Sequence, residues 1–393
     1  MRNIKFILLL TVMAVVFGCG GDSSDGSNIV PLSSVTITTK APTLSNDNTI
    51  MNTGGILSSE FENMGSFGAG VCYSITPNPT IQDQISQSNN MVVNFTTEIT
   101  PISFGATYYL RAYVRNFSTN EVKYGNEVTF QVPSPLTTGI VKNISTTGFT
   151  VDVNVSTVLA SNIERGVCYS TSQNPTVDNS DFQSGTTGSG VFTINVVPPT
   201  GFPFYYVSSN TNYYLRSYVK IGNFYYYGNQ VTFRTAGYIG GSGGFVFFDK
   251  GETTNGWRYL ESAPIYLTTS GSSYFQWSNS ACGYTFLNGI GTAIGDGANN
   301  TTLIKNFCNY TNIAATMCRV TSLNGQTDWF LPSIDEAKEL YKLKFTGLIN
   351  INGDFVSSSQ LSDALCFAVN SSNGNSYTAS KSSGYNAWQV RRF

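Results

Sequence analysis

Short runs of alternating apolar and polar residues fill most of the chain between residues 33 and 235. In the run at 108–114, for example, Tyr108, Leu110, Ala112 and Val114 occupy every second position. Neighbouring side chains of a β-strand point to opposite faces of its sheet, so this spacing predicts a strand with one face in a core. Turn-forming residues separate the runs. The pattern predicts an all-β architecture for this part of the chain.

Two similar repeats contain these runs. Gly-Val-Cys-Tyr-Ser at 70–74 recurs at 166–170, Tyr-Tyr-Leu-Arg at 108–111 recurs at 213–216, and Tyr-Gly-Asn at 124–126 recurs at 227–229. Repeats of about 100 residues have the length of a Greek-key β-sandwich. Both repeats resemble fibronectin type III-like modules. We predict two such modules, module 1 over residues 33–134 and module 2 over residues 135–235.

Three features of the modules carry further expectations. The tyrosine that starts each Tyr-Tyr-Leu-Arg motif opens the penultimate strand, which is the place of the tyrosine corner in Greek-key sandwiches. Each module has one cysteine, Cys72 or Cys168, and we expect both to stay unpaired. Aromatic clusters at 202–206 and 224–227 are interpreted as sandwich core and as packing against the next domain. The alternative is a carbohydrate-stacking surface.

Beyond residue 236 the pattern mixes strands and helices and predicts an α+β domain over residues 237–393, the terminal domain. We expect strands at 245–248 and 257–260, helical structure within 302–318, and a closing hairpin formed by 366–369 and 387–393.

The most patterned stretch of the terminal domain surrounds a predicted helix start. Pro332 disfavours a helical conformation at the residue before it, and Ser333 then occupies an N-cap position. Glu336 follows three residues later, which is the spacing of a capping box. We therefore interpret Ser333 and Glu336 as structural residues, in preference to a catalytic role for the neighbouring acids.

Several segments of the terminal domain resemble, in order, the C-terminal domain of the Legionella collagen-like adhesin. They are Gly-Phe-Val-Phe-Phe-Asp at 244–249, Ile-Gly-Asp-Gly at 294–297, Asp-Trp-Phe-Leu-Pro-Ser at 328–333 with Trp329 at its centre, three serines at 357–359, and Val-Arg-Arg-Phe at 390–393. The resemblance implies a C-type-lectin-like fold, trimeric assembly and binding of sulfated polysaccharides. The tryptophans and the C-terminal arginines are candidate ligand contacts: Trp257, Trp277, Arg391 and Arg392.

The N-terminus has the layout of a lipoprotein leader. Residues 1–18 combine a positive start with an apolar segment too short to span a membrane, and Cys19 follows as the expected lipid-anchor site. Residues 19–32 form a flexible, acidic tether. The acidic residues after Cys19 resemble the surface-export signal of Bacteroidota lipoproteins. We expect a chain anchored in the outer membrane and exposed on the cell surface.

Composition narrows the classes of function. The chain contains no histidine, which removes the commonest general base and the commonest zinc ligand. Its formal net charge is −2, whereas nucleic-acid binding leaves a basic footprint. Charged residues make up only 11% of the chain, against about 25% in an average protein. We expect a surface-located binding protein that is not an enzyme and needs no cofactor, metal or nucleic acid.

Two site assignments stay open at this level. Cys282, Cys308, Cys318 and Cys366 allow three disulfide pairings or buried free thiols. Asp296 lies in a glycine-rich loop with Asn299 and Asn300, where oxygen ligands for Ca²⁺ are the alternative to a tight turn with local side-chain bonds.

Three functions compete for the whole chain. The first is an adhesin-like protein that presents a domain binding extracellular polysaccharide or a host glycan. The second is a structural or assembly component that binds a protein partner or forms a homo-oligomer. The terminal domain has ten Lys and Arg against ten Asp and Glu, which favours this second function. The third is an envelope enzyme that uses carboxylates such as Asp328 and Asp335.

Overall fold

The computed structural model describes residues 31–46, 49–58, 66–90, 92–156, 163–185, 187–197, 207–268 and 274–393. The leader, Cys19, most of the tether and the aromatic residues at 202–206 lie outside the described residues. Within the described ranges, no helix is long and apolar enough to cross a membrane. The described chain is mostly β-sheet. It divides into two compact units, one built from module 1 and one from module 2 together with the terminal domain.

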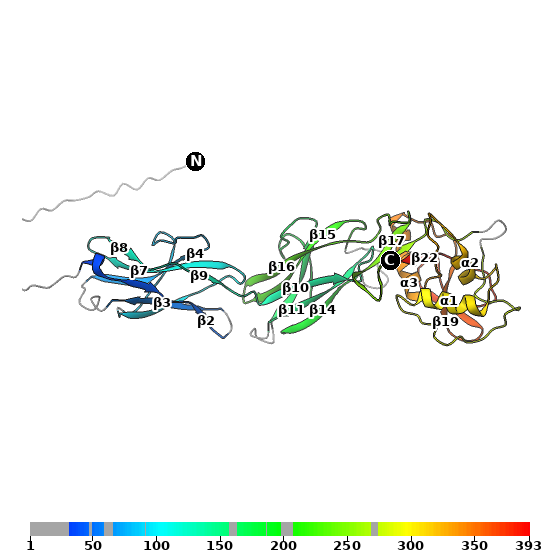
Figure 1. Cartoon of the computed structure of the whole chain (residues 1–393), viewed down its shortest axis with the longest axis horizontal. Coiled ribbons are helices and arrows are strands. Elements are labelled where there is room, and N and C mark those ends of the chain that lie inside the picture. The colour runs from blue at the N-terminus through cyan, green and yellow to red at the C-terminus, as the bar shows by residue number, and fades with distance from the viewer. Residues whose placement is uncertain are drawn as a thin grey trace, which may run out of the picture. The chain divides into compact units, whose positions relative to one another are not determined.

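Module 1 consists of two antiparallel sheets (Figure 1). One sheet has the order β1-β3-β2, with β6 paired to β3; the other has the order β5-β4-β7-β8, with β9 also paired to β7. The strands are β1 (Ile37–Thr39), β2 (Thr43–Leu44), β3 (Met51–Leu57), β4 (Phe67–Ser74), β5 (Gln84–Gln87), β6 (Asn94–Ile99), β7 (Thr107–Asn116), β8 (Val122–Tyr124) and β9 (Val128–Gln131), and a short 3-10 helix, η1 (Leu32–Ser34), precedes them.

Alternation decides which face of each strand is buried in module 1. Along β6, exposed and buried residues alternate strictly. In β7, Leu110, Ala112 and Val114 are fully buried, as their spacing predicts. Burial of such side chains removes apolar surface from water, which stabilises a module by about 25 cal/mol per Å².

Module 2 repeats this plan with sheets of order β10-β11-β14 and β13-β12-β15-β16. The strands are β10 (Leu136–Lys142), β11 (Phe149–Val155), β12 (Glu164–Ser170), β13 (Asp181–Ser184), β14 (Gly190–Val196), β15 (Asn212–Ile221) and β16 (Phe224–Arg234). One core cluster, which includes Val151, Val167 and Leu215, takes residues from both sheets, so module 2 is a β-sandwich. The backbone N–H of Ser208 donates to the Tyr213 hydroxyl at 2.9 Å, which is the bond of a tyrosine corner.

The repeated motifs make the same internal contacts in both modules. The guanidinium of Arg111 lies 4.6 Å from the centroid of the Tyr124 ring, and that of Arg216 lies 4.7 Å from the Tyr227 ring. The Thr39 and Thr138 backbone N–H groups donate to the side chain of the asparagine in each Tyr-Gly-Asn motif, at 3.0 and 2.9 Å. The repeated residues therefore hold the two sheets of each module together.

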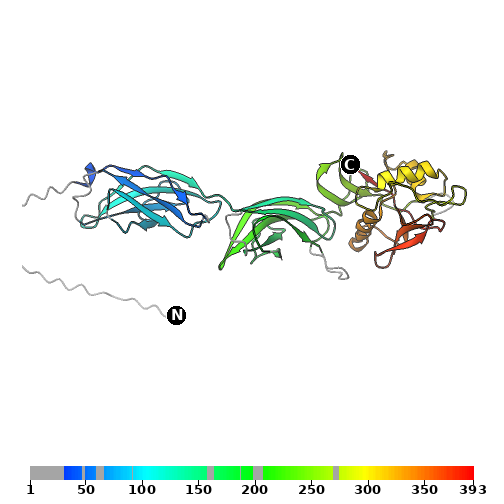
Figure 2. The same cartoon turned by 90° about the horizontal axis from the view of Figure 1, so that it is seen from below.

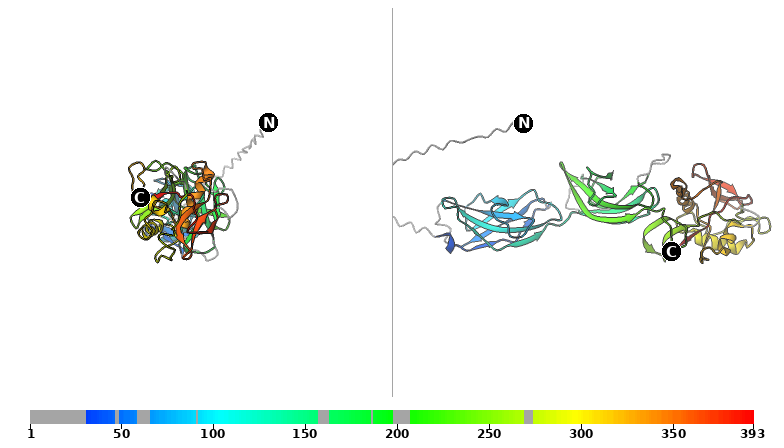
Figure 3. Two further views of the ribbon diagram at one scale, coloured as in Figure 1. Left: turned by 90° about the vertical axis from the view of Figure 1, so that its right-hand side faces the viewer. Right: turned by 90° about the horizontal axis from the view of Figure 1, so that it is seen from above.

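Within its described residues, the terminal domain contains two small antiparallel sheets and three α-helices. The sheets have the orders β17-β18-β22 and β19-β20-β21. The elements are β17 (Phe245–Thr254), β18 (Trp257–Ser262), α1 (Gly297–Phe307), α2 (Ala314–Val320), α3 (Ile334–Tyr341), the 3-10 helix η3 (Lys342–Thr346), β19 (Phe355–Gln360), β20 (Leu365–Val369), β21 (Ser376–Ser380) and β22 (Val390–Arg392). Figures 2 and 3 show α1 in yellow and the red and orange sheet of β19–β21 as separate layers of this domain.

The helical structure expected within 302–318 is present as two helices, α1 and α2, because the chain leaves the helix after Phe307 and starts again at Ala314. The expected closing hairpin is wrong in its second strand. The closing hairpin pairs β20 with β21. The C-terminal strand β22 instead pairs with β18 in the other sheet, a long-range pairing that local alternation does not reveal.

Candidate functional site

The patterned stretch at 328–336 starts helix α3. Ser333 is its N-cap: the Ser333 hydroxyl accepts the Glu336 backbone N–H at 3.3 Å, and the Glu336 carboxylate accepts the Ser333 backbone N–H at 2.8 Å. These reciprocal bonds form the capping box that the spacing predicts. Trp329 and Pro332 are buried beside it. All four residues of the motif thus lie in the interior.

The Glu336 carboxylate also ties α3 to the glycine-rich loop before α1. It accepts the Gly295 backbone N–H at 2.9 Å. A side chain at Gly297 would place its Cβ 2.2 Å from a Glu336 oxygen, so this close approach requires glycine. Glu336 is fully buried, and burial raises its pKa to about 7 against the opposing effect of the backbone N–H groups of Ser333, Gly295 and Gly297.

Asparagine and serine side chains extend this network to β19. Asn300 bonds the backbone of Gly291 through both ends of its amide, at 2.9 and 2.8 Å, and also donates to the Ser358 hydroxyl at 3.2 Å. The Ser359 hydroxyl accepts the Ile334 N–H at 3.0 Å and donates to the Gly291 carbonyl at 2.7 Å. We call Asn300, Ser333, Glu336, Ser358 and Ser359 the buried network.

The candidate Ca²⁺ ligands take part in local turn bonds. Asp296 accepts the Ala293 backbone N–H at 2.9 Å, and Asn299 donates to the Gly289 carbonyl at 3.1 Å. Asn300 belongs to the buried network. These bonds are those of a tight turn stabilised by its own side chains.

Both candidate tryptophans lie in the core. Trp257 is 5% exposed and Trp277 is 1% exposed. The Lys250 ammonium lies 3.8 Å from the Trp257 ring centroid. The Lys381 ammonium lies 4.0 Å from the Trp277 ring; burial lowers the pKa of Lys381 to about 8. Neither ring offers a solvent-facing platform in this structure, and a ligand-binding role for them stays a prediction.

The candidate arginines have protein partners. The Arg391 guanidinium donates to both carboxylate oxygens of Asp328, at 2.9 and 3.1 Å, and lies 3.7 Å from the buried carboxylate of Glu261. That carboxylate accepts the backbone N–H groups of Ser242 and Gly244, which belong to the glycine-rich segment at 240–244. Arg392 donates to the Gly295 carbonyl at 3.0 Å. Their role as anion donors also stays a prediction.

The four cysteines of the terminal domain give one disulfide and two free thiols. Cys282 and Cys308 are bonded, with their Cα atoms 5.5 Å apart. Cys318 and Cys366 are buried and free, and burial raises the pKa of both thiols. The sequence predicts a disulfide among these residues, and the structure confirms one and fixes its pairing.

The disulfide joins two segments that carry exposed aromatic rings. Tyr284 follows Cys282 by two residues, and Tyr310 follows Cys308 by two. The four rings of this region are between 41% and 63% exposed: Tyr274, Tyr284, Phe286 and Tyr310. We call these four residues, which lie on the two segments that the disulfide joins, the aromatic face. Large exposed apolar side chains are candidate contacts for a binding partner.

A chain of amide side chains holds the same segments together. Asn279 donates to the Asn312 carbonyl oxygen at 3.1 Å, and Asn312 donates to the Gln276 carbonyl oxygen at 2.7 Å. Gln276 in turn donates to the Ser382 backbone carbonyl. Residues 274–290 and 306–313 contain no charged side chain. These two segments therefore offer aromatic rings and amides, and a charged group beside them is the Lys381 ammonium, which donates to the Thr285 carbonyl at 2.9 Å.

Sequence reasoning missed the aromatic face because it favoured tryptophan as the sugar-stacking residue. The available signal was the absence of charge in residues 274–290, together with two tyrosines at matched distances from two cysteines. Only the pairing of Cys282 with Cys308 shows that these tyrosines belong to one region.

Neither the protein-family models nor the curated proteins gave a match to the chain. Among solved structures, the chain is similar to the crystal structure of chicken CNTN1 FN1–FN3 domains. The identity is 11%, the match covers 51% of this chain and 67% of that chain, and the TM-score is 0.21. At this TM-score the similarity supports no statement about the function of the chain.

Proposed function

We propose that the chain is a lipid-anchored cell-surface protein whose terminal domain binds a glycan or polysaccharide. The aromatic face carries this proposal. Sugar rings present C–H groups that pack on aromatic rings, and their hydroxyls need both donors and acceptors, which amide side chains supply. A Tyr-rich, uncharged surface held by a disulfide loses little conformational freedom on binding. The lipoprotein-like leader and Cys19 support a location of this surface outside the cell.

Within the same proposal, modules 1 and 2 are fibronectin type III-like spacers and the terminal domain has a C-type-lectin-like fold. The three-strand and four-strand sheets of module 2, with the tyrosine corner at Tyr213, support the first part. The ordered motifs of the terminal domain support the second. The carboxylates that an enzyme would need are engaged: Asp328 by Arg391, and Asp335 by Lys338 at 3.2 Å. This engagement favours binding over catalysis.

The test compares glycan binding by variants of the full-length protein in detergent. We expect the double variant Tyr284→Ser/Tyr310→Ser to bind neutral and sulfated glycans about thirtyfold more weakly than the unaltered chain, because each of the two lost stacking contacts removes about 1 kcal/mol. Val191→Ser is the control, since Val191 is 75% exposed in module 2. We expect this control to bind normally.

The outcomes separate the competing functions. Binding that persists at high salt supports an uncharged stacking surface, because salt screens only charged contacts. If the double variant binds every glycan as well as the unaltered chain does, the aromatic face is not the site. If the unaltered chain binds no glycan but one protein partner is lost with the double variant, the chain is an assembly component.

A further inference from the structure

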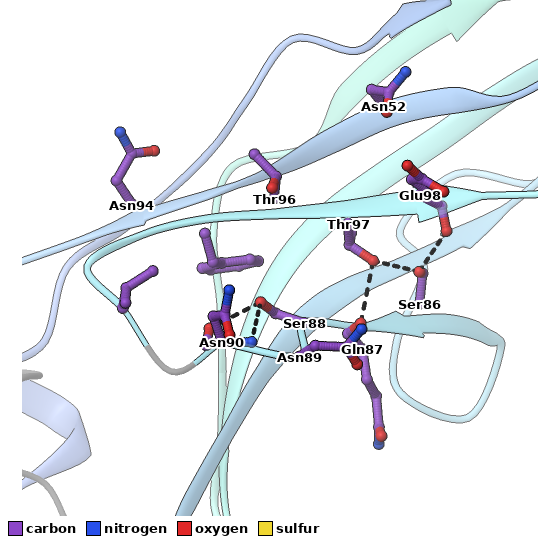
Figure 4. Close-up of a pocket in the computed structure, with 12 residues that line it drawn as sticks. Asn52, Ser86, Gln87, Ser88, Asn89, Asn90, Asn94, Thr96, Thr97 and Glu98 are labelled. Atoms are coloured by element: carbon purple, nitrogen blue, oxygen red, sulfur yellow. Dashed lines mark hydrogen bonds between the residues drawn. The ribbon is translucent and has the colours of Figure 1, made fainter. Parts of the chain in front are cut away.

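Module 1 carries a polar groove beside the outer face of its first sheet (Figure 4). The groove has a volume of about 560 Å³ and lies between β3 and β6 on one side and β5 with its following loop on the other. Pockets of about 300–1,000 Å³ are typical of small-ligand sites. Its lining residues are Asn52, Ser86, Gln87, Ser88, Asn89, Asn90, Val92, Asn94, Phe95, Thr96, Thr97 and Glu98.

One wall of the groove is fixed by internal hydrogen bonds. The Ser86 hydroxyl donates to the Glu98 backbone carbonyl at 2.6 Å, and the Thr97 hydroxyl donates to the Gln87 carbonyl at 3.3 Å. These bonds hold β5 against β6. They also engage a carbonyl at the free edge of β6, which disfavours the addition of a peptide strand there.

The opposite wall has polar side chains that are not hydrogen-bonded to other residues of the lining. Figure 4 shows no hydrogen bond from Asn52, Asn94 or Thr96 to another residue of the lining. Thr96 and Asn94 are exposed on β6, and Asn52 lies opposite Glu98 in the register of β3 and β6. Three neighbouring side chains can thus bond a ligand without breaking a bond within the groove.

The same place on module 2 is filled by an ion pair. Thr39 pairs with Gly55 in module 1 and Thr138 pairs with Val153 in module 2, which aligns the two modules residue by residue. Gly54 opposite Thr96 therefore corresponds to Asp152 opposite Thr193.

Asp152 is fully engaged. It accepts the Lys142 ammonium at 2.8 Å and the Thr193 hydroxyl at 2.8 Å. Gly54 has no side chain, and an added Cβ would lie 2.1 Å from the Phe95 carbonyl oxygen. At this point module 1 has the Lys40 ammonium, which donates to the Phe95 carbonyl at 2.8 Å, whereas module 2 has the pair of Lys142 and Asp152.

The chemistry of the lining selects the class of ligand. Amide and hydroxyl groups dominate it, and each amide both donates and accepts, as sugar hydroxyls do. Glu98 is the one ionisable residue of the lining, and the Lys40 ammonium donates to the carbonyl of the lining residue Phe95 at 2.8 Å. The groove therefore has one group of each charge beside it, without an excess of positive charge that would favour a sulfated or phosphorylated ligand. Val92, which is 47% exposed, adds an apolar contact for a sugar ring.

We propose that this groove binds a neutral polysaccharide, so that module 1 is a second carbohydrate-binding module in addition to being a spacer. The ligand would lie along the outer face of β6, with its hydroxyls bonded to the side chains of Asn52, Asn94 and Thr96. The site is separate from the aromatic face and does not depend on the function proposed for the terminal domain.

The test measures binding of the full-length protein to three neutral polysaccharides: laminarin, yeast mannan and galactomannan. Two groove variants are compared with the unaltered chain, namely Asn52→Ala/Asn94→Ala and Thr96→Tyr. The first removes ligand bonds and the second fills the groove with a residue that strands tolerate well. Thr193→Tyr, at the corresponding position of module 2, is the matched control.

We expect both groove variants to bind at least one of these polysaccharides about tenfold more weakly, since two hydrogen bonds contribute about 0.5–1.5 kcal/mol each. Thr193→Tyr should bind within about twofold of the unaltered chain, an energy difference below about 0.5 kcal/mol. Addition of the polysaccharide should also slow amide hydrogen exchange in β6. Unchanged melting temperatures of the exposed-site variants would show that folding is intact.

Several results would overturn the proposal. The groove is not a carbohydrate site if the unaltered chain binds none of the three polysaccharides, or if Thr96→Tyr binds them normally. It is a protein contact if the groove variants change only self-association. If Tyr284→Ser/Tyr310→Ser loses all binding and the groove variants lose none, the terminal domain is the only carbohydrate site, and the function proposed for that domain survives without this one.

Discussion

The buried network and the aromatic face of the terminal domain differ in how their residues stand out in the sequence. Network residues such as Ser333 and Glu336 form ordered, recognisable motifs, and the structure places them in the interior. The aromatic face has no motif, and its rings are exposed. The contrast teaches that recognisable motifs in this domain mark residues that hold it together, whereas the proposed binding surface has no motif.

The two sandwich modules repeat this contrast. Their shared motifs make the same interior contacts, such as the Arg111 and Arg216 stacks on tyrosine. Even their thiols have matching environments: Cys72 and Cys168 are buried, and burial raises the pKa of each to about 11. The modules differ on the outer face of the first sheet, where one has a groove and the other an ion pair. We therefore look for function on the outer face of the first sheet, where the two modules differ.

The largest expected loss of stability comes from a substitution that breaks the buried network. Glu336→Ala removes a carboxylate that satisfies backbone N–H groups of Ser333 and Gly295. We expect the terminal domain to lose about 3 kcal/mol or more of unfolding free energy, because buried donors are left without acceptors. Chemical denaturation of the full-length chain, followed by tryptophan fluorescence, measures this loss, because all four tryptophans lie in that domain.

Glu339→Ala is the control for this prediction. Glu339 lies on the same helix and pairs with Lys342 near the surface, with its side chain 21% exposed. We expect a loss below about 1 kcal/mol. If both variants are equally stable, the motif at 328–336 does not hold the domain together.

The next effect is the pH dependence that Glu336 gives to the same domain. Its pKa is raised by burial to about 7, whereas an unfolded glutamate titrates near about 4.3. Between these values the folded chain holds a proton that the unfolded chain has released, so stability is highest at low pH and falls as pH rises through 7.

A melting series between pH 5 and pH 8 measures this dependence. The tryptophan-reported melting temperature should fall across the range. In Glu336→Gln, which cannot ionise at this position, the slope should be smaller. Equal slopes in both proteins would assign the dependence to other groups.

Local chemistry made part of the structure predictable. The helix start at Ser333 follows from side-chain bonds three residues apart, and the strands of the modules follow from alternation. The pairing of β22 with β18 did not follow, because it joins residues about 130 positions apart in the chain. Long-range pairing also determines the other two features that the sequence did not reveal. The aromatic face depends on the disulfide between Cys282 and Cys308, and the groove of module 1 depends on strand register.

A smaller effect on stability tests whether the same interior hydrogen bonds stabilise both modules. The Thr39 and Thr138 hydroxyls accept the backbone N–H groups of Ala112 and Ser217, both at 2.9 Å. Thr39→Val and Thr138→Val keep the side-chain shape but leave these buried donors unpaired. Each should lower the stability of its own module by about 1–3 kcal/mol.

Hydrogen exchange resolved by module measures both losses in the full-length chain. A loss in one module alone would show that the repeated motif is structural in only one copy. The two changes should cost similar amounts, because each hydroxyl makes one further bond: the Thr39 hydroxyl donates to the Asn126 carbonyl at 2.5 Å, and the Thr138 hydroxyl bonds the Ser217 hydroxyl at 2.8 Å.

The smallest effect concerns the outer faces, where the copies differ. Lys142→Ala removes the cation that pairs with Asp152, and both side chains are about one-third exposed. Solvent screens such a pair, so we expect module 2 to lose less than about 1 kcal/mol. Asn52→Ala, on the corresponding face of module 1, should change stability even less, because Figure 4 shows no bond from Asn52 within the groove. If either change destabilised its module as much as Thr39→Val does, the outer face would belong to the structural framework, and the inference from difference to function would fail.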